Sequence, residues 1–402
     1  MTTNTSTMAS APNTHLYSPS SKDGAMKVVH ELQKETVLAL DSEGVHLGKT
    51  GLLTLLQIGT MSGEVYLFDV LKNEKEQDKR FFKDTGLDAI LTCSDIVKVI
   101  HSCARDSAAL IHQFGISLKN VFDTQVAHLV IEERKGRKLP SRLKLTEICR
   151  TYSTEAHAYE RKDEFKSEWA IRQGDFWATR PLTPEMIAYA SGDVTAVIPD
   201  VYETQKGFLE KNDLLDVLEE RVREELDYHS NKAARTRRKL RNDGNVQAIL
   251  KNMSKKYYQG TDFETLTEKD EISALSLLRL EEASRYPPVI QHLKEASWRA
   301  KVRKLEESLK DTAQTNSFAG LPYELQNVES DGTVEMKREI RRLKQLAVPI
   351  INQIFCEKYS AKTPWQKISS NDIEILRSFR PVEEMYDPVV LALYQKVKNI
   401  YI

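Results

Sequence analysis

The sequence predicts an α/β domain built on a mixed β-sheet, followed by a mainly α-helical region. Short apolar runs at 36–41, 52–60 and 64–70 have the composition of strands, and a glycine between the last two favours a hairpin turn. Beyond the hairpin, strand-like runs at 96–101 and 120–124 alternate with segments of helical periodicity. A hairpin followed by alternating strands and helices indicates a sheet that contains both antiparallel and parallel pairs.

Four segments carry the helical pattern within this domain. Residues 84–95, 103–115 and 125–133 repeat apolar side chains at helical spacing, and the second of them ends on a glycine. The segment 183–209 predicts one long helix that begins near Thr183, with a proline in its first turn. We expect this long helix to close the domain.

The chain divides into three parts by composition. Residues 1–25 are polar and predict a disordered tail, and the first twenty contain no lysine, arginine or continuous apolar stretch, which excludes a secretory signal. The α/β domain occupies 26–205. Residues 206–402 are rich in Leu, Glu, Lys and Arg at helical spacing, and they predict a separate, mainly helical region.

Composition narrows the class of protein and its compartment. The 58 basic and 59 acidic residues nearly cancel, so bulk charge gives no indication of nucleic-acid binding. The four cysteines show no paired CxxC spacing, which favours reduced thiols and an intracellular protein of the cytoplasm or nucleus. No window approaches the roughly 20 apolar residues that span a bilayer, so we expect a soluble protein.

Two carboxylates, Asp41 and Glu43, stand where the first apolar run ends. Side chains alternate along a strand, so an Asp-x-Glu pair presents both carboxylates on one side. Two anions held this close repel each other unless a cation lies between them. A bare pair of this kind is most often a solvated strand end, so the metal interpretation requires support from elsewhere in the chain.

That support comes from three later residues. Asp106 lies in the first turns of a predicted helix after a strand, and Tyr189 and Asp193 are four residues apart, so they share one face of the long helix. Each has an ordinary structural explanation when taken alone. Together, four carboxylates and a tyrosine suit two divalent cations, Mg²⁺ or Mn²⁺, in phosphodiester hydrolysis.

Taken in order, these motifs resemble those of the DEDD exonuclease superfamily. The DSE triplet, the HSCARD block and the Y-x3-D pair resemble its three exonuclease motifs, and the tyrosine is typical of the DEDDy branch, which includes RNase D, the Werner-type exonuclease and polymerase proofreading domains. The resemblance covers about residues 30–205 and is closest to exonuclease-domain proteins related to Egalitarian. It implies an RNase H-like mixed sheet of five strands, the second antiparallel, with flanking helices.

The resemblance also implies a function and a role for each motif residue. Asp41, Glu43, Asp106 and Asp193 would hold two divalent cations, and Tyr189 would orient or help to activate the attacking water. The implied activity is 3′-5′ exonuclease cleavage of nucleic acid with 5′-monophosphate products, on single-stranded RNA, with DNA as the alternative. A second implied function is an RNA-binding adaptor or scaffold, in RNA transport or small-RNA pathways, that does not depend on cleavage.

A competing alignment assigns the HSCARD block to the third motif of the DEDDh branch. His101 would then activate the water, and the second motif would have to lie between the first and His101. This alignment leaves Tyr189 and Asp193 without a role, so we favour the DEDDy interpretation. The second-motif acids available to the competing alignment are Asp69, Asp84, Asp88 and Asp95.

Further residues are candidates for contact with substrate or partners. The resemblance places His46, Leu55, Gln57 and His101 near the bound nucleotides. Residues 231–241 contain six basic side chains and no acid. A basic run of this kind can bind phosphates, serve as a nuclear localisation signal or simply form a solvated helix face. We also expect a protein partner to be able to bind the C-terminal helical region. The basic side chains of the run are Lys232, Arg235, Arg237, Arg238, Lys239 and Arg241.

Overall fold

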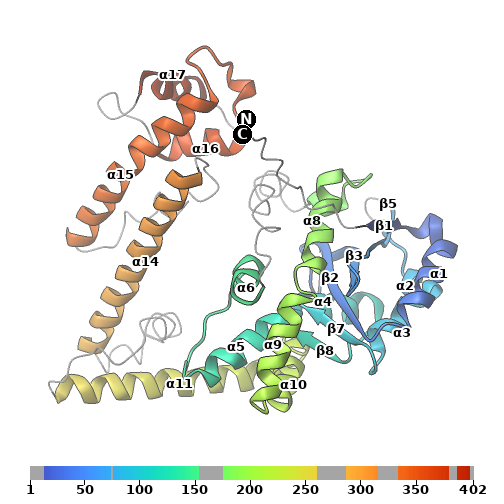
Figure 1. Cartoon of the computed structure of the whole chain (residues 1–402). Helices are drawn as coiled ribbons and strands as arrows, with labels where there is room; N and C mark the ends of the chain where they lie inside the picture. The colour runs from blue at the N-terminus through green and yellow to red at the C-terminus, as the bar shows by residue number, and fades with distance from the viewer. Residues whose placement is uncertain are drawn as a thin grey trace, which may run out of the picture. The chain divides into compact units, whose positions relative to one another are not determined.

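The computed structural model of the chain contains two compact units (Figure 1). Among the described residues, the first unit ends at Ile249 and the second begins at Leu250. The structure describes residues 13–73, 76–153, 175–259, 287–315, 334–379 and 387–398.

A six-stranded mixed sheet forms the centre of the first unit. Its strand order is β1-β4-β3-β2-β7-β8, and only β3 runs antiparallel to its neighbours. The predicted mixed sheet and the hairpin are therefore confirmed, with one strand more than the five expected. The strands are β1 (Thr14–Tyr17), β2 (Val37–Val45), β3 (Leu52–Thr60), β4 (Val65–Asp69), β7 (Val97–Ile100) and β8 (Val121–Asp123), and a separate pair consists of β5 (Leu71–Asn73) and β6 (Glu76–Gln77).

The extra strand, β1, comes from a segment that was expected to be disordered. It pairs in parallel with β4 along its whole length, and the ring of Tyr17 stacks on that of Phe68 with centroids 5.7 Å apart. Helix α1 (Lys22–Leu32) follows directly and buries Ala25. The prediction of a disordered tail is therefore wrong for residues 13–25, because a short strand gains its stability from the sheet it joins rather than from its own composition. Residues 1–12 lie outside the described residues.

Helices cover both faces of the sheet. Alternate residues of β2 point in opposite directions, so Leu38 and Leu40 pack against one group of helices while Ala39 packs against the other. The first group contains α1, α2 (Phe81–Thr85), α3 (Leu87–Thr92) and α4 (Ala104–Ala109). The second contains α5 (Thr124–Arg134), α6 (Leu145–Tyr152), α8 (Pro184–Thr195), α9 (Asp200–Lys211) and α10 (Leu215–Leu226).

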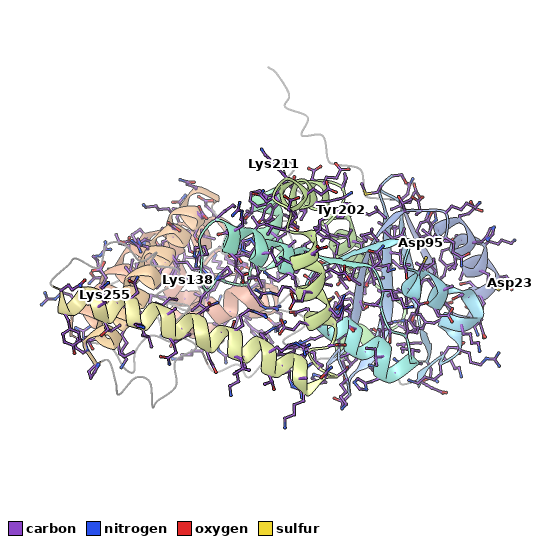
Figure 2. All side chains as sticks on the ribbon, turned by 90° about the horizontal axis from the view of Figure 1, so that it is seen from below. Asp23, Asp95, Lys138, Tyr202, Lys211 and Lys255 are labelled. Atoms are coloured by element: carbon purple, nitrogen blue, oxygen red, sulfur yellow. The ribbon has the colours of Figure 1, made fainter. Side chains whose placement is uncertain are left out.

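Two predicted helices are interrupted. The long helix expected over 183–209 is wrong, because it is divided into α8 and α9 at Pro199, whose ring cannot continue a helix that has already begun. Helix α9 carries Tyr202 and ends at Lys211 (Figure 2). The helix expected over 103–115 continues past α4 as a turn of π-helix, η2 (Leu110–Phe114), and ends at Gly115 as predicted.

The described residues after the α/β domain are mainly helical, as predicted. Helix α11 (Lys232–Tyr258) begins in the first unit, and the second unit has its own apolar cluster. The first compact unit includes α9 and α10, and the functional boundary expected at 205 stays a prediction. None of the described helices is long and apolar enough to cross a membrane. The other helices are α14 (Pro287–Thr315), α15 (Val334–Lys358), α16 (Ser370–Phe379) and α17 (Pro388–Val397), with the short 3₁₀ turns η1 (Pro19–Ser21), η4 (Asp175–Ala178) and η7 (Trp365–Lys367).

Candidate metal centre

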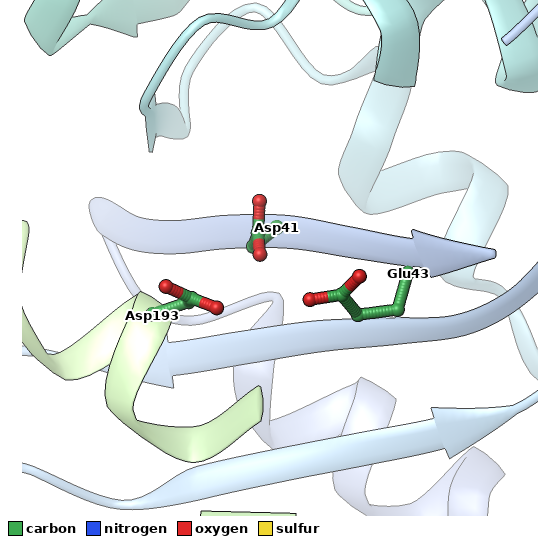
Figure 3. Close-up of side chains that lie close together, drawn as sticks. All are labelled: Asp41, Glu43 and Asp193. Carbon is green, nitrogen blue, oxygen red and sulfur yellow. The ribbon is translucent and has the colours of Figure 1, made fainter. Parts of the chain in front are cut away.

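Three predicted metal ligands meet at the end of β2. Carboxylate oxygens of Asp41, Glu43 and Asp193 all lie within 4.8 Å of one another (Figure 3). Asp41 and Glu43 share a face of β2, while Asp193 comes from α8, 150 residues further along the chain. The sheet and this helix therefore bring together three acids of the kind that bind hard divalent cations.

Local interactions explain why α8 reaches this position. The hydroxyl of Thr183 caps the helix by accepting a hydrogen bond from the amide of Met186 at 3.3 Å. Gly59 of β3 lies directly beneath the helix, since a Cβ atom there would come within 3.2 Å of the Val194 side chain. The missing side chain allows α8 to pack closely on the sheet, and it sets the height at which Asp193 meets the β2 carboxylates.

The fourth predicted ligand, Asp106, lies in α4 and is only 5% exposed. Burial, and then the nearby Asp41 carboxylate, raise the pKa of Asp106 well above its ordinary value. Its Oδ1 atom is buried and accepts no hydrogen bond from the described residues. A cation at this position would balance the charge of Asp106 and satisfy this oxygen, so the donor set fits a divalent metal.

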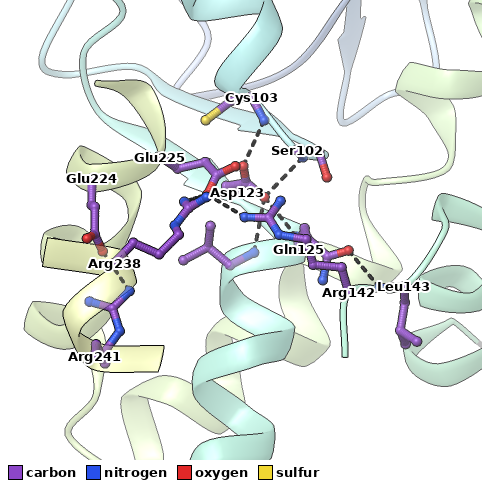
Figure 4. Close-up of polar contacts among 11 residues, drawn as sticks. Ser102, Cys103, Asp123, Gln125, Arg142, Leu143, Glu224, Glu225, Arg238 and Arg241 are labelled. Carbon is purple, nitrogen blue, oxygen red and sulfur yellow. Dashed lines mark hydrogen bonds and ion pairs between the residues drawn. The ribbon is translucent and has the colours of Figure 1, made fainter. Parts of the chain in front are cut away.

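The buried carboxylate of Asp123 fixes the start of α4. It accepts hydrogen bonds from the backbone amides of Ser102 at 3.1 Å and Cys103 at 2.8 Å, and two more from the first turn of α5 (Figure 4). Asp123 therefore anchors the helix that carries Asp106. The sequence reasoning missed this residue, although an aspartate between a strand and a helix is a recognisable N-cap signal.

A second polar anchor holds the segment that precedes α8. Arg180 donates to both carboxylate oxygens of Asp69 on β4 and to the carbonyl oxygens of Trp177 and Thr179. The sequence reasoning assigned no role to Arg180, and no local signal links it to an acid 111 residues away. Asp69 is thereby engaged outside the metal centre.

The other acids of the competing alignment also lie elsewhere. Asp84 forms an ion pair with Lys22 at 2.8 Å. Asp88 accepts a hydrogen bond from the amide of Ala89 at 2.9 Å, and Asp95 is exposed. Among the described residues, the acids close enough to share one metal are Asp41, Glu43 and Asp193, a group that includes none of these four acids and does not include Asp106.

The remaining predicted residues differ in their burial. Tyr189 is half-buried one helical turn before Asp193, and its ring lies 5.9 Å from that of Trp177. Leu55 and Gln57 are fully buried, and Gln57 stands opposite Asp41 in the β2–β3 ladder. His46 is exposed just beyond β2, with φ of 50°.

His101 lies at the end of β7. Its Nδ1 atom is 2.9 Å from the Thr124 hydroxyl. Contact of His101, His46, Leu55 or Gln57 with substrate stays a prediction.

The predicted basic run does not form one free cationic surface. Arg238 pairs with Glu225, and Arg241 pairs with Glu224 at 2.7 Å, so both balance the charge of buried carboxylates of α10 (Figure 4). Arg235 donates to the carbonyl oxygen of Tyr228. The other three side chains of the run, Lys232, Arg237 and Lys239, are exposed on α11.

Comparison with known proteins assigns the domain. Residues 18–204 match the model of the 3′-5′ exonuclease family, which confirms the predicted resemblance for this segment.

Among curated proteins, the chain is 35% identical over 170 residues to the piRNA biogenesis protein EXD1 of Mus musculus, covering 42% of this chain and 29% of that protein. It is 32% identical over 112 residues to the Egalitarian protein homolog of Caenorhabditis elegans, covering 27% of this chain and 18% of that protein. The chain thus spans less than a third of either relative. Among solved structures, Trypanosoma brucei RNase D aligns with a TM-score of 0.39 at 23% identity, covering 48% of this chain and 71% of that one.

Proposed function

We propose that the protein is a metal-dependent 3′-5′ exonuclease that shortens single-stranded RNA and releases 5′-monophosphate nucleotides. The observation that carries this proposal is the convergence of Asp41, Glu43 and Asp193 within 4.8 Å, in a segment of the 3′-5′ exonuclease family. Preference for RNA over DNA rests on the names of the relatives, which place one of them in piRNA biogenesis.

Two divalent cations, Mg²⁺ or Mn²⁺, fit the chemistry of the donor set. Asp41, Glu43, Asp193 and Asp106 would hold them, with the Asp106 carboxylate ionised by the cation despite its burial. When bound, such cations stabilise the charge that develops on the attacking and leaving oxygens of a phosphodiester.

Tyr189 is the residue we assign to orienting the attacking water. It precedes Asp193 by one helical turn, so its side chain lies on the same face of α8 as a metal ligand. The phenol can accept a hydrogen bond from the water and donate one to a phosphate oxygen. This assignment also accounts for the third motif, which the competing role of His101 does not use.

The direct test is incubation of the purified protein with 5′-labelled single-stranded RNA, with and without Mn²⁺. We expect metal-dependent shortening by single nucleotides, lost in Asp41→Asn and in Asp193→Asn. Asp95→Asn is the matched control, because Asp95 is an exposed acid of the same domain outside the metal centre. Parallel reactions with DNA and with 3′-phosphorylated RNA define the preferred sugar and strand end.

A second function is favoured by the names of the relatives. An RNA-binding adaptor, acting in RNA transport or small-RNA pathways, would hold an RNA end at the same site without cutting it, and the C-terminal helical region would bind a protein partner. Either function belongs in the cytoplasm or nucleus. Tight binding of RNA that is never shortened with any divalent metal would support the adaptor and reject the exonuclease.

A further inference from the structure

The connection between β2 and β3, residues 46–51, lies beside the metal centre. It begins three residues after Glu43, on the strand that carries both Asp41 and Glu43. We call it the 46–51 loop. Its exposed side chains are those of His46, Lys49 and Thr50.

The backbone of this loop adopts positive φ angles, which are unfavourable for most residues and need stabilising contacts from the surrounding structure. His46 has φ of 50° and Gly48 has φ of 145°, a region open essentially to glycine. A Cβ atom at Gly51 would lie 1.8 Å from the carbonyl oxygen of His46, so the chain folds back tightly on itself. A two-residue turn is enough to join antiparallel strands. The length and the backbone conformation of this six-residue loop therefore indicate a role beyond joining β2 to β3.

Gln113 supplies the support. Its Nε2 atom donates to the carbonyl oxygens of Gly48, at 2.9 Å, and of Gly51. Its Oε1 atom accepts from the amide of Leu53, at 3.0 Å, and from Nε2 of Gln77, at 2.7 Å. Both donors and both acceptor sites of the side-chain amide are therefore used: the donors on the loop itself, and the acceptors on β3 and β6.

The position of Gln113 links the loop to a metal ligand. Gln113 lies in η2, the π-helical turn that continues α4, and α4 carries Asp106. Turns of π-helix occur frequently at functional sites. The same short helical segment thus places an acid of the metal centre and fixes the loop that borders it.

We propose that Gln113 is a positioning residue for substrate binding, which holds the 46–51 loop in the shape that contacts the sugar-phosphate backbone of the bound strand. This inference rests on the proposed function. The exposed side chains of the loop, His46, Lys49 and Thr50, offer an imidazole, an ammonium group and a hydroxyl, which can bind phosphate and ribose oxygens. The ammonium group of Lys49 also places positive charge near a centre whose own protein groups are acidic, where a polyanion must approach. Gln113 itself does not contact the bound strand in this proposal; it affects substrate binding by holding the 46–51 loop in place.

Two variants test the role of the loop by independent routes. Gln113→Met removes all four hydrogen bonds with little change in volume, whereas Gly48→Ala disturbs only the backbone, since no atom lies within 4 Å of the added methyl group. The control is Gln205→Met, which removes a buried glutamine that donates to the Thr124 carbonyl oxygen in the same unit.

The measurements separate substrate binding from metal binding and from folding. We expect both loop variants to weaken the affinity for 5′-labelled oligo(A) RNA, measured with Ca²⁺, by about tenfold, the typical loss for one charged hydrogen bond. The KM for cleavage with Mn²⁺ should rise by a similar factor while kcat changes little. Affinity for Mn²⁺ by calorimetry should match the wild type, and amide exchange should accelerate only in residues 46–51 and, in Gln113→Met, at Leu53, whose amide loses its acceptor.

Faster exchange in the loop with unchanged RNA affinity and KM would reject the proposal and leave Gln113 a purely structural residue. A loss of Mn²⁺ affinity in both variants would also reject it, because the effect would then act through the metal ligands. If the wild type binds RNA without cutting it, the exonuclease proposal fails, yet the tenfold affinity difference still tests the loop.

Discussion

Arg180 donates two hydrogen bonds to the buried carboxylate of Asp69, from Nε at 2.5 Å and from Nη2 at 2.8 Å. This pair connects the segment before α8 to β4, and α8 carries Asp193. We expect Arg180→Met to lower the free energy of unfolding by about 3–5 kcal/mol, because it leaves a buried charge without its partner. Chemical denaturation followed by circular dichroism measures this loss.

Arg80→Met is the control for that prediction. Its side chain is 81% exposed and pairs with Asp84 on the surface, so we expect a loss below about 1 kcal/mol. The double variant Arg180→Met with Asp69→Leu should recover part of the stability, since both charges are then removed. Equal losses in Arg180→Met and Arg80→Met would contradict the structural role of the buried pair.

Asp123 should affect metal binding without touching the metal. Replacement by Asn turns one acceptor oxygen into a donor that faces backbone amides, so the start of α4 loses part of its anchor. We expect destabilisation of about 1–3 kcal/mol and weaker Mn²⁺ binding, because Asp106 is no longer held in place. Calorimetric titration of folded Asp123→Asn with Mn²⁺ checks the second effect. Undiminished Mn²⁺ affinity in that variant would show that α4 keeps its position without Asp123.

The carboxylates of the metal centre should destabilise the protein when no metal is present. Asp41, Glu43 and Asp193 repel one another at the observed spacing, so Asp41→Asn and Asp193→Asn should each raise the melting temperature in EDTA. Mn²⁺ should raise the melting temperature of the wild type, by mass action, and have little effect on either variant. A wild type that responds to Mn²⁺ no more than Asp41→Asn does would argue against a metal site here.

Local sequence patterns were sufficient to predict some features of the site, but they could not predict contacts between distant segments. The period of two along β2 paired Asp41 with Glu43, and the spacing of four along α8 paired Tyr189 with Asp193. The order of the motifs and their resemblance to the exonuclease motifs joined the two pairs before the fold was known. The contact of Arg180 with Asp69 depends on tertiary packing across 111 residues, and no local pattern encodes it.

Strand β1 escaped prediction for a related reason. Its four residues, Thr14–Tyr17, carry too weak a signal to outweigh the polar segment around them, and β4 supplies the pairing that makes them a strand. Conversely, periodicity joined α8 and α9 into one helix because apolar spacing continues through Pro199. Here the covalent restriction of proline outweighed the pattern.

Lys98 should give the unfolding free energy a distinctive dependence on pH. The side chain is 1% exposed, and its Nζ atom donates to the carbonyl oxygens of Cys93 and Ile96. Burial lowers the pKa of Lys98 from 10.5 to about 8. Between those values the unfolded chain binds more protons than the folded protein, so the contribution of Lys98 to stability rises with pH across this window and is constant below and above it.

Replacement of Lys98 by Met isolates this contribution from those of other groups that titrate in the same range. Denaturation of both proteins from pH 7 to pH 11 should show the stability advantage of the variant over the wild type shrinking by on the order of 3 kcal/mol, most of it between pH 8 and pH 10.5. The lost hydrogen bonds to Cys93 and Ile96 add an offset that does not vary with pH. A difference between the two proteins that stays constant over this range would mean that the folded protein does not lower the pKa of Lys98.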